Sequence, residues 1–344
     1  MALPEAEAKS IAFFAQGTYW PIPAIGLTIG ARYTSDRKAL DSFVQRTSLN
    51  PATPGAVLSG FPFVATTART YHSFTPKFGI DWQITPNAMV YASATKGFKS
   101  GGTNYAATNP AFLNYKPESI WAYEIGAKTE WFDRRLRLNV AAFHYDYTDL
   151  QVLQPLAPGI VAINNAASAT IKGLEFEASA KPWSSLLLTA NYSLLDARYD
   201  EFPASAVVAG LVPYVASSPR YSPLTRTFNA GGDRMNAAPK STFSASAQYD
   251  HDIGYGSIFV RGEYYWQASA SYDPSNAPIL VEPSYDLINL SLGYKSDDGR
   301  WTLNIQTKNL TDREYLVGRS AAGVVPAGLA GPPRTIILQL SHKW

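Results

Sequence analysis

The side chains best suited to catalysis or metal binding are few and widely spaced in this chain. The sequence has four histidines, His72, His144, His251 and His342, and no cysteine. No two histidines have the short spacing of a metal-binding pair, so we predict no metal site. No grouping of Ser, His and an acidic residue marks a catalytic triad. We therefore predict a protein that is not an enzyme and that holds no cofactor.

Two further patterns carry weak chemical signals. Asp196, Asp200 and Glu201, in the stretch DARYDEF, could bind calcium through their carboxylates, although a solvated acidic rim is the favoured interpretation. The glycine stretches 100–102 and 230–232 lack the strand–glycine–helix context of a phosphate-binding loop. Neither pattern predicts an active site.

Aromatic and arginine side chains gather in two long segments that are otherwise rich in turn-forming residues. They are Tyr105, Phe112, Tyr115, Tyr214, Arg220, Tyr221 and Arg226. Aromatic faces and guanidinium groups suit an anionic, planar ferric chelate. The same side chains would equally suit loops that pack on themselves, so both interpretations stay open.

The elements that must position these loops are β-strands. In WAYEIGAKTEW, Trp121, Ile125 and Trp131 share one face with other apolar residues, whereas Glu124 and Lys128 lie on the opposite face. About thirteen such alternating segments recur along the chain, which predicts an all-β protein. Near Ala141–Ala142 the alternation of residues 136–147 changes phase, which predicts a β-bulge.

The connections alternate between short and long. The short ones are 85–88, 132–135, 181–185, 253–257 and 296–300, and the long ones lie near 36–72, 99–118, 203–238, 271–282 and 317–332. This asymmetry predicts a transmembrane, antiparallel, up-and-down β-barrel with short periplasmic turns and long extracellular loops. A soluble β-sandwich would not require a polar face in nearly every strand.

Bulk properties and strand length agree with a membrane wall. Charged residues make up only 16% of the chain and the formal net charge is +2, so nucleic acid is not a predicted partner. The ten-residue separation of Trp121 and Trp131 gives roughly 33 Å at about 3.3 Å per residue. With a tilt near 40° that rises roughly 25 Å, the height of the apolar band that faces outer-membrane lipid.

Several motifs resemble the β-barrel of TonB-dependent receptors of the bacterial outer membrane. They are GFKSGGTN (97–104), PESIWAYEIGAKTEW (117–131), LRLNVAAFHYDYTDLQV (136–152), IKGLEFEA (171–178), NLTDREY (309–315) and the terminal Trp344. The resemblance covers most of residues 70–344. It implies TonB-dependent uptake of a ferric siderophore or a similarly scarce ligand. It also implies that the terminal strand, with Leu340, His342 and Trp344 on one face, is read by the barrel-insertion machinery.

The chain departs from the full pattern of that family. Such receptors have about 22 strands, a plug domain and a signal peptide, and neither of the last two is recognised in this sequence. We therefore expect residues 1–344 to form a partial barrel domain that is not competent for transport by itself. The alternative is a self-contained porin-like channel, which predicts an even strand number and pairing between the first and last strands.

Acidic residues on the predicted polar face form the last candidate site. Glu124, Glu175 and Glu177 face the lumen by strand parity. Lys128 and Lys172 lie on nearby strands and could satisfy them. The resemblance implies a second role, in which the acidic residues of these motifs dock arginines of the plug domain, while the periplasmic protein TonB pulls on that plug. We predict that Glu124 and Glu175 are plug-docking residues.

Overall fold

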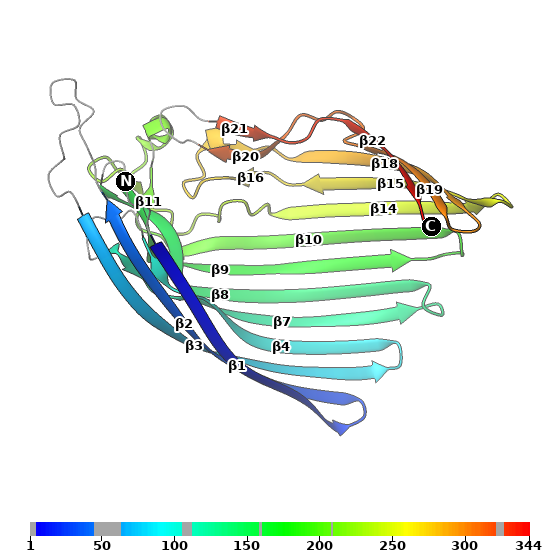
Figure 1. Ribbon diagram of the computed structural model, residues 1–344, viewed down its shortest axis with the longest axis horizontal. Coiled ribbons are helices and arrows are strands. Elements are labelled where there is room, and N and C mark those ends of the chain that lie inside the picture. The colour runs from blue at the N-terminus through cyan, green and yellow to red at the C-terminus, as the bar shows by residue number, and fades with distance from the viewer. Residues whose placement is uncertain (1–4, 45–62, 105–111, 158–159, 208, 321–326) are drawn as a thin grey trace.

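The computed structural model describes residues 5–44, 63–104, 112–157, 160–207, 209–320 and 327–344. Thirteen strands form one sheet in which each strand pairs antiparallel with its neighbours in chain order (Figure 1). They are β1 (Glu5–Ile22), β2 (Ile25–Val44), β3 (Phe63–Thr85), β4 (Ala88–Lys99), β7 (Glu118–Trp131), β8 (Leu136–Ala157), β9 (Ile160–Ala180), β10 (Leu186–Glu201), β14 (Ser241–Asp252), β15 (Gly256–Gln267), β18 (Tyr285–Ser296), β19 (Trp301–Lys308) and β22 (Thr335–His342). The predicted all-β, up-and-down architecture is confirmed.

Short turns and long loops lie at opposite ends of the sheet, as predicted. The tight turns gather at one end of Figure 1, and the long connections lie at the other. The segment expected to be a long loop near 36–72 is partly strand, because β2 extends to Val44 and β3 begins at Phe63. Alternation continues into those extensions but with polar residues on both faces, which hid them in the sequence.

The long connections contain small elements of their own. They are β5 (Gly102–Thr103), β6 (Asn114–Tyr115), β11 (Ser205–Ala206), η2 (Ala209–Leu211), α1 (Val212–Val215), β12 (Tyr221–Ser222), β13 (Thr227–Phe228), β16 (Ala270–Ser271), η3 (Pro278–Leu280), β17 (Val281–Glu282), β20 (Leu316–Ser320) and β21 (Ala327–Ala330). Within the described ranges, no helix has the length and apolar character needed to cross a membrane.

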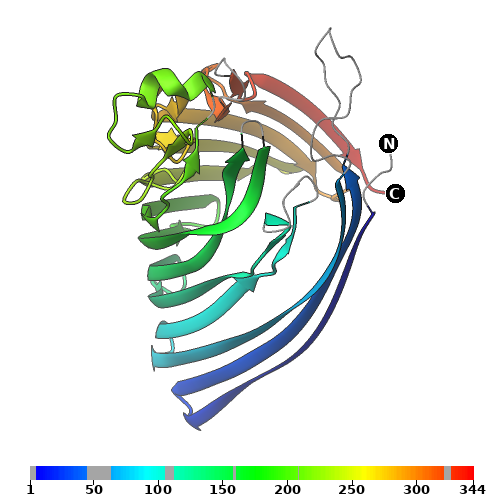
Figure 2. The ribbon, with the colours of Figure 1, turned by 90° about the vertical axis from the view of Figure 1, so that its left-hand side faces the viewer.

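The sheet is an open, curved wall, which Figure 2 shows end-on. Strands β1 and β22 are its two edges, and no pairing joins them among the residues that the structure describes. The hairpin β5–β6 contacts both β2 and β9, which lie five strands apart in the sheet, so this hairpin occupies the concave side. The porin-like alternative, which requires the first and last strands to pair, receives no support.

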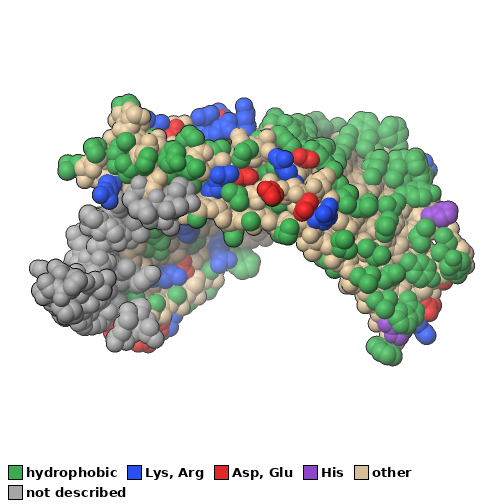
Figure 3. All heavy atoms as spheres, turned by 90° about the horizontal axis from the view of Figure 1, so that it is seen from above, with side chains coloured by type: hydrophobic (Ala, Val, Ile, Leu, Met, Phe, Trp, Pro, Cys, Tyr) green, Lys and Arg blue, Asp and Glu red, His purple; other side chains and the backbone are tan. Residues whose placement is uncertain are grey.

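The two faces of the wall differ as the sequence predicted. Ile125 and Trp131 are 61% and 52% exposed on the convex face, although both are large and apolar. Hydrophobic side chains cover this face over the half of the sheet nearer the turns, and charged side chains gather nearer the loops (Figure 3). Such a broad apolar surface on a soluble monomer would be unusual, whereas hydrocarbon accepts it.

Aromatic side chains on the concave face cover glycines on the neighbouring strand. Tyr91 lies against Gly126 and Phe143 lies against Gly173, where a β-carbon would approach the rings to 2.7 and 2.6 Å. These pairs restore packing where a glycine would leave a gap in the sheet. They also explain why the predicted bulge at Ala141–Ala142 is wrong, because the inward aromatic Phe143 imitates a change of phase.

The register of β8 in fact remains regular through that stretch. The irregularity lies further along, between Tyr147 and Leu150, where Asp149 has a positive φ of 55°. An L-residue with positive φ is uncommon and marks a local change of strand direction.

Replacing Gly173 with Ala should lower the free energy of unfolding by about 1–3 kcal/mol, because overpacking displaces neighbouring atoms. The added β-carbon would collide with the carbonyl oxygen of Leu194 and with the ring of Phe143. Urea-induced unfolding in lipid vesicles, followed by Trp fluorescence, measures the change. Gly17→Ala is the matched control, because nothing lies within 4 Å of its added β-carbon. Equal destabilisation by the two substitutions would contradict the close-approach explanation.

Candidate functional site

Three glutamates converge on one niche in the concave face. Strand pairing places Glu124 on β7 beside Phe143 of β8, and it places Glu175 and Glu177 of β9 beside Ala141 and Asn139. A cavity of about 170 Å³ lies among them, and it is lined by Tyr91, Glu124, Ala127, Lys128, Asn139, Val140, Ala141, Glu175 and Glu177. The sequence therefore identified residues that the fold brings together.

Hydrogen bonds hold two of these carboxylates in place. The Tyr91 hydroxyl donates to Glu124 Oε1 at 2.6 Å, and Asn139 Nδ2 donates to Glu177 Oε2 at 3.1 Å. No ion pair to any of the three glutamates exists among the described residues. The niche therefore carries concentrated negative charge on a partly enclosed wall.

Neither of the two lysines considered as partners forms an ion pair with these glutamates among the described residues, although Lys128 lines the same cavity. Lys128 Nζ lies 5.5 Å from the centre of the Tyr91 ring and interacts with the aromatic face. Lys172 lies opposite His144 of β8 and Asp196 of β10. Its position in β9 alternates with that of Glu175, so its side chain projects from the convex face. The suggestion that Lys172 satisfies Glu175 is wrong, because the two lie three positions apart in one strand and an odd number of positions reverses the face.

Another acidic residue of β7 shows what a neutralised carboxylate looks like in this sheet. Glu130 forms ion pairs with Arg134 at 3.2 Å and with Arg137 at 3.0 Å. It lies on the same face as Glu124 but nearer the turns. The contrast isolates Glu124, Glu175 and Glu177 as carboxylates that can still accept a cationic partner.

The loop between β10 and β14 is folded around its own apolar core. Phe202, Val207, Leu211, Val215 and Phe228 are buried there, together with Leu280 from the β15–β18 loop. Two loops thus share one core instead of extending separately into solvent.

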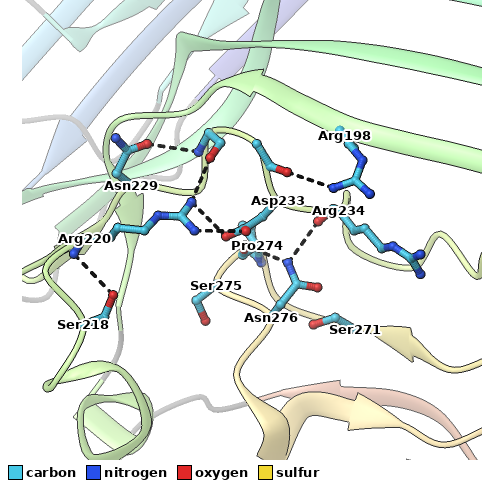
Figure 4. Close-up of polar contacts among 12 residues, drawn as sticks. Arg198, Ser218, Arg220, Asn229, Asp233, Arg234, Ser271, Pro274, Ser275 and Asn276 are labelled. Atoms are coloured by element: carbon cyan, nitrogen blue, oxygen red, sulfur yellow. Dashed lines mark hydrogen bonds and ion pairs between the residues drawn. The ribbon is translucent and has the colours of Figure 1, made fainter.

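Arg220 is used by this loop for its own stability. Its guanidinium forms an ion pair with Asp233 at 3.0 Å, donates to the Gly231 carbonyl at 2.8 Å and lies 4.8 Å from the centre of the Phe228 ring (Figure 4). Asn276 of the next loop donates to the Arg234 carbonyl at 3.2 Å. For Arg220 the structure favours self-packing over ligand binding.

The other predicted ligand-binding residues of this loop occupy different settings. Tyr221 is half-buried against the shared core, whereas Tyr214 is 45% exposed on α1 and Arg226 is exposed with a φ of 52°. Tyr214 and Arg226 therefore remain available for a ligand.

The loop between β4 and β7 is anchored by buried amides that sequence reasoning missed. Asn104 donates to the carbonyls of Phe112 and Ile163 at 2.8 and 2.9 Å, and its own oxygen accepts from the Ile163 N–H. Gln151 donates to the Ser100 carbonyl at 3.0 Å. These contacts join the end of GFKSGGTN to strands β8 and β9 and hold the loop over the concave face.

Within the same loop, Phe112 and Tyr115 are half-buried, and the predicted Tyr105 lies outside the described residues. The Tyr115 phenol is protonated near neutral pH and can donate a hydrogen bond, and burial raises its pKa further.

A buried ion pair joins the last two loops. Arg319 donates to Glu282 Oε2 through Nε at 2.9 Å and through Nη2 at 2.6 Å, and the Leu316 N–H donates to Glu282 Oε1 at 3.0 Å. Glu282 is only 5% exposed. The β15–β18 and β19–β22 loops are therefore locked together.

The remaining predicted residues lie near the ends of the wall. Asp196 pairs with Arg198 at 2.8 Å, and Asp200 accepts from Thr170 at 2.8 Å, which favours the acidic-rim interpretation over calcium. No group of three or more His, Asp or Glu side chains within the described ranges could hold a metal ion. On β22, Leu340 is exposed on the convex face, and the His342 ring lies between those of Trp301 and Trp344.

The family becomes clear when the chain is compared with known proteins. The family model described as "TonB dependent receptor-like, beta-barrel" matches residues 2–310. The chain belongs to this family. The resemblance drawn from the motifs is therefore confirmed.

Two curated relatives of this TonB-dependent receptor barrel are named as receptors for metal chelates. The metal-pseudopaline receptor CntO of Pseudomonas aeruginosa is 26% identical over 277 residues, which are 80% of this chain and 34% of that receptor. The ferric-pyoverdine M114 receptor PbuA of Pseudomonas sp. is 27% identical over 272 residues, 78% of this chain and 29% of that receptor. The chain thus spans about a third of the length of these relatives.

Solved structures share the fold. The ferric yersiniabactin uptake receptor FyuA from Yersinia pestis superimposes with a TM-score of 0.78 at 18% identity, covering 98% of this chain and 46% of that one. The siderophore receptor PiuA from Acinetobacter baumannii gives a TM-score of 0.74 at 16% identity, covering 99% and 44%. The barrel wall of such receptors is therefore the architecture of this chain.

Replacing Arg319 with Gln should free the two loops from each other, because it leaves Glu282 buried without its cation. Loss of one partner of a buried ion pair costs about 3–5 kcal/mol. Limited proteolysis should cleave the 268–284 and 309–334 loops faster in the variant. Arg334→Gln is the control, because its pair with Asp312 is about half exposed and 3.7 Å long. Indistinguishable cleavage of the two variants would show that the buried pair does not lock the loops.

Proposed function

We propose that this chain forms part of the wall of a bacterial outer-membrane receptor that imports a ferric siderophore, or a similarly scarce metal chelate, with energy supplied through TonB. The two-faced sheet of a TonB-dependent receptor barrel is the observation that carries the proposal. The names of the curated relatives support the ligand class, since two of them are receptors for pseudopaline-bound metal and ferric pyoverdine.

The larger assembly is part of the proposal. The relatives are about three times as long as the matched region, and both edge strands of the sheet have unpaired sides within the described residues. In hydrocarbon such edges require partners, because each unsatisfied backbone group costs several kcal/mol. We propose that further strands close the barrel around a plug domain, and that the wall by itself does not transport.

The acidic niche has a defined role in this mechanism. Glu124, Glu175 and Glu177 present carboxylates to the lumen without a cationic partner among the described residues. An arginine of a plug domain would bind such a group through short, charge-assisted hydrogen bonds. Because both charges leave water only in part, the contact would hold the plug at rest and still release it under a directed pull.

The packed loops would form the outer mouth of the same path. Their shared core and buried ion pair give them a fixed shape, so they can present exposed groups such as Tyr214 and Arg226 to a ligand. Preorganised loops bind with a smaller entropic cost than loops that must fold around the ligand. The insertion machinery would recognise Leu340, His342 and Trp344 during assembly.

The lipid-facing assignment predicts a face-specific effect on insertion. Ile125→Arg should weaken insertion by about 2–4 kcal/mol, because it places a charge near the bilayer midplane. Lys128→Arg on the concave face should have almost no effect. Heat-modifiable mobility of protein extracted from the outer membrane measures the inserted fraction. Similar losses in both variants would show that the faces are wrongly assigned.

The assignment of Glu124 and Glu175 as plug-docking residues predicts a transport defect. In the intact receptor, Glu124→Gln combined with Glu175→Gln should weaken plug docking about 10- to 100-fold, the loss expected for hydrogen bonds to charged groups. Uptake of radiolabelled ferric chelate should fall, and large antibiotics should leak through the barrel. Glu130→Gln is the control, because Glu130 is already paired with arginines of the wall. Normal uptake and an intact antibiotic barrier in the double variant would rule out plug docking by Glu124 and Glu175.

A further inference from the structure

A second pocket lies on the concave face near the loop end of the sheet. It has a volume of about 400 Å³, within the usual range for small-ligand sites. It is lined by Ala6, Glu7, Ala8, Lys38, Ala39, Lys99, Ser100, Gly101, Gly102, Thr103 and Tyr115. One side is formed by β1 and β2, and the other by the hairpin β5–β6 and the residues that lead into it.

Two glycines of the pocket let aromatic rings approach the backbone closely. A β-carbon on Gly101 would come within 2.6 Å of the Tyr71 ring, and one on Gly102 would collide with the Tyr115 hydroxyl. The Tyr71 hydroxyl also donates to the Gly102 carbonyl at 3.3 Å. Leu113, from the same loop, packs on Leu40 of β2 and fixes the hairpin against the wall.

Two positively charged side chains stand next to each other beside this pocket. Lys38 on β2 pairs directly across the strands with Arg69 on β3, so two cations stand side by side on one face. Like charges opposite each other destabilise a sheet. On β1, the residue opposite Lys38 is Ala8. The three paired residues Ala8, Lys38 and Arg69 therefore include no carboxylate.

Among the described residues, no carboxylate forms an ion pair with Lys38 or Arg69. Glu118 forms a long ion pair of 3.7 Å with Lys99, and its other oxygen accepts the Gln151 N–H at 2.7 Å. Asp36 lies one row nearer the turns and is buried, but no ion pair joins it to Lys38 or Arg69 in the described part of the chain. Glu7 is among the lining residues, but by register its side chain belongs to the opposite face, where it forms an ion pair with Lys9.

The pocket also contains hydrogen-bond donors for an anion. The Ser100 hydroxyl oxygen is enclosed and has no hydrogen-bond partner among the described residues. The Tyr115 hydroxyl is protonated near neutral pH, as a phenol ordinarily is, and burial raises its pKa further. Cations and neutral donors together form an environment suited to oxygen atoms that carry negative charge.

We propose that this pocket binds the negatively charged oxygens of an anionic ferric chelate, such as those of catecholate or carboxylate groups, and that it discriminates against neutral chelates. The proposal rests on the proposed receptor function. Lys38 and Lys99 line the pocket, and Arg69 stands beside Lys38 on the neighbouring strand, outside the lining itself. The ligand would relieve the repulsion between Lys38 and Arg69, neither of which forms an ion pair with a carboxylate of the described residues.

The test measures how fast an amine-reactive reagent labels Lys38 in outer-membrane vesicles from cells that carry the intact gene. Trianionic ferric tris-catecholate, present at about ten times its Kd, should slow the labelling of Lys38 about tenfold. Neutral ferric tris-acetohydroxamate and inorganic phosphate should not slow it at matched ionic strength. Lys9, on the opposite face, is the internal reference in each sample.

Variants separate the pocket from the general charge of the wall. Arg69→Gln should abolish the protection of Lys38, and Arg69→Lys should retain most of it. Arg37→Gln should leave protection unchanged, because Arg37 lies on the same strand as Lys38 but on the other face. Labelling that is unaffected by every probe, equal protection by both iron complexes, or protection by phosphate and not by the trianionic chelate would each overturn the proposal.

Chelate uptake by the same cells distinguishes the pocket from the receptor function. Protection of Lys38 without TonB-dependent uptake of iron would support the pocket and contradict the proposed transport. Uptake of the trianionic chelate with Lys38 unprotected would support transport and overturn the pocket.

Discussion

Hydrocarbon offers no hydrogen-bond partner to a peptide group, and the rest of this structure depends on that constraint. Every strand that crosses a membrane must satisfy its backbone through its neighbours. The chain does this with thirteen antiparallel strands in nearly continuous register. Period-two alternation is what such a wall requires, because in a membrane one face of each strand would meet lipid and the other would meet water. Both the apolar convex face and the charged concave face are consequences of this ladder.

Once the strand pairing is set, the register alone decides which side chains are neighbours on the concave face. The niche of Glu124, Glu175 and Glu177 and the cations Lys38 and Arg69 are rows of residues that pairing sets side by side. The acidic niche lies within the wall and the basic pocket lies near the loops. This separation fits an assembly that attracts an anion at its mouth and holds a cationic domain further inside.

The sequence predicted the wall well because alternation and turn chemistry are local properties. It missed the buried pair Glu282–Arg319 and the ion pair Arg220–Asp233 because these join segments whose approach depends on the folded loops. The bulge at Ala141–Ala142 was wrongly predicted because inward aromatics over glycines imitate the lipid-facing pattern. Lys172 and Glu175 have opposite parity in the sequence itself, which places their side chains on opposite faces of β9.

Single-cysteine labelling tests the two-faced wall most directly, because the chain contains no cysteine of its own. One cysteine at a time would replace each residue from Ala122 to Thr129 on β7, in intact outer membranes. The account predicts that a water-soluble thiol reagent labels positions 122, 124, 126 and 128, whereas a lipid-dissolved reagent labels 123, 125, 127 and 129. Labelling without this alternation would contradict the account.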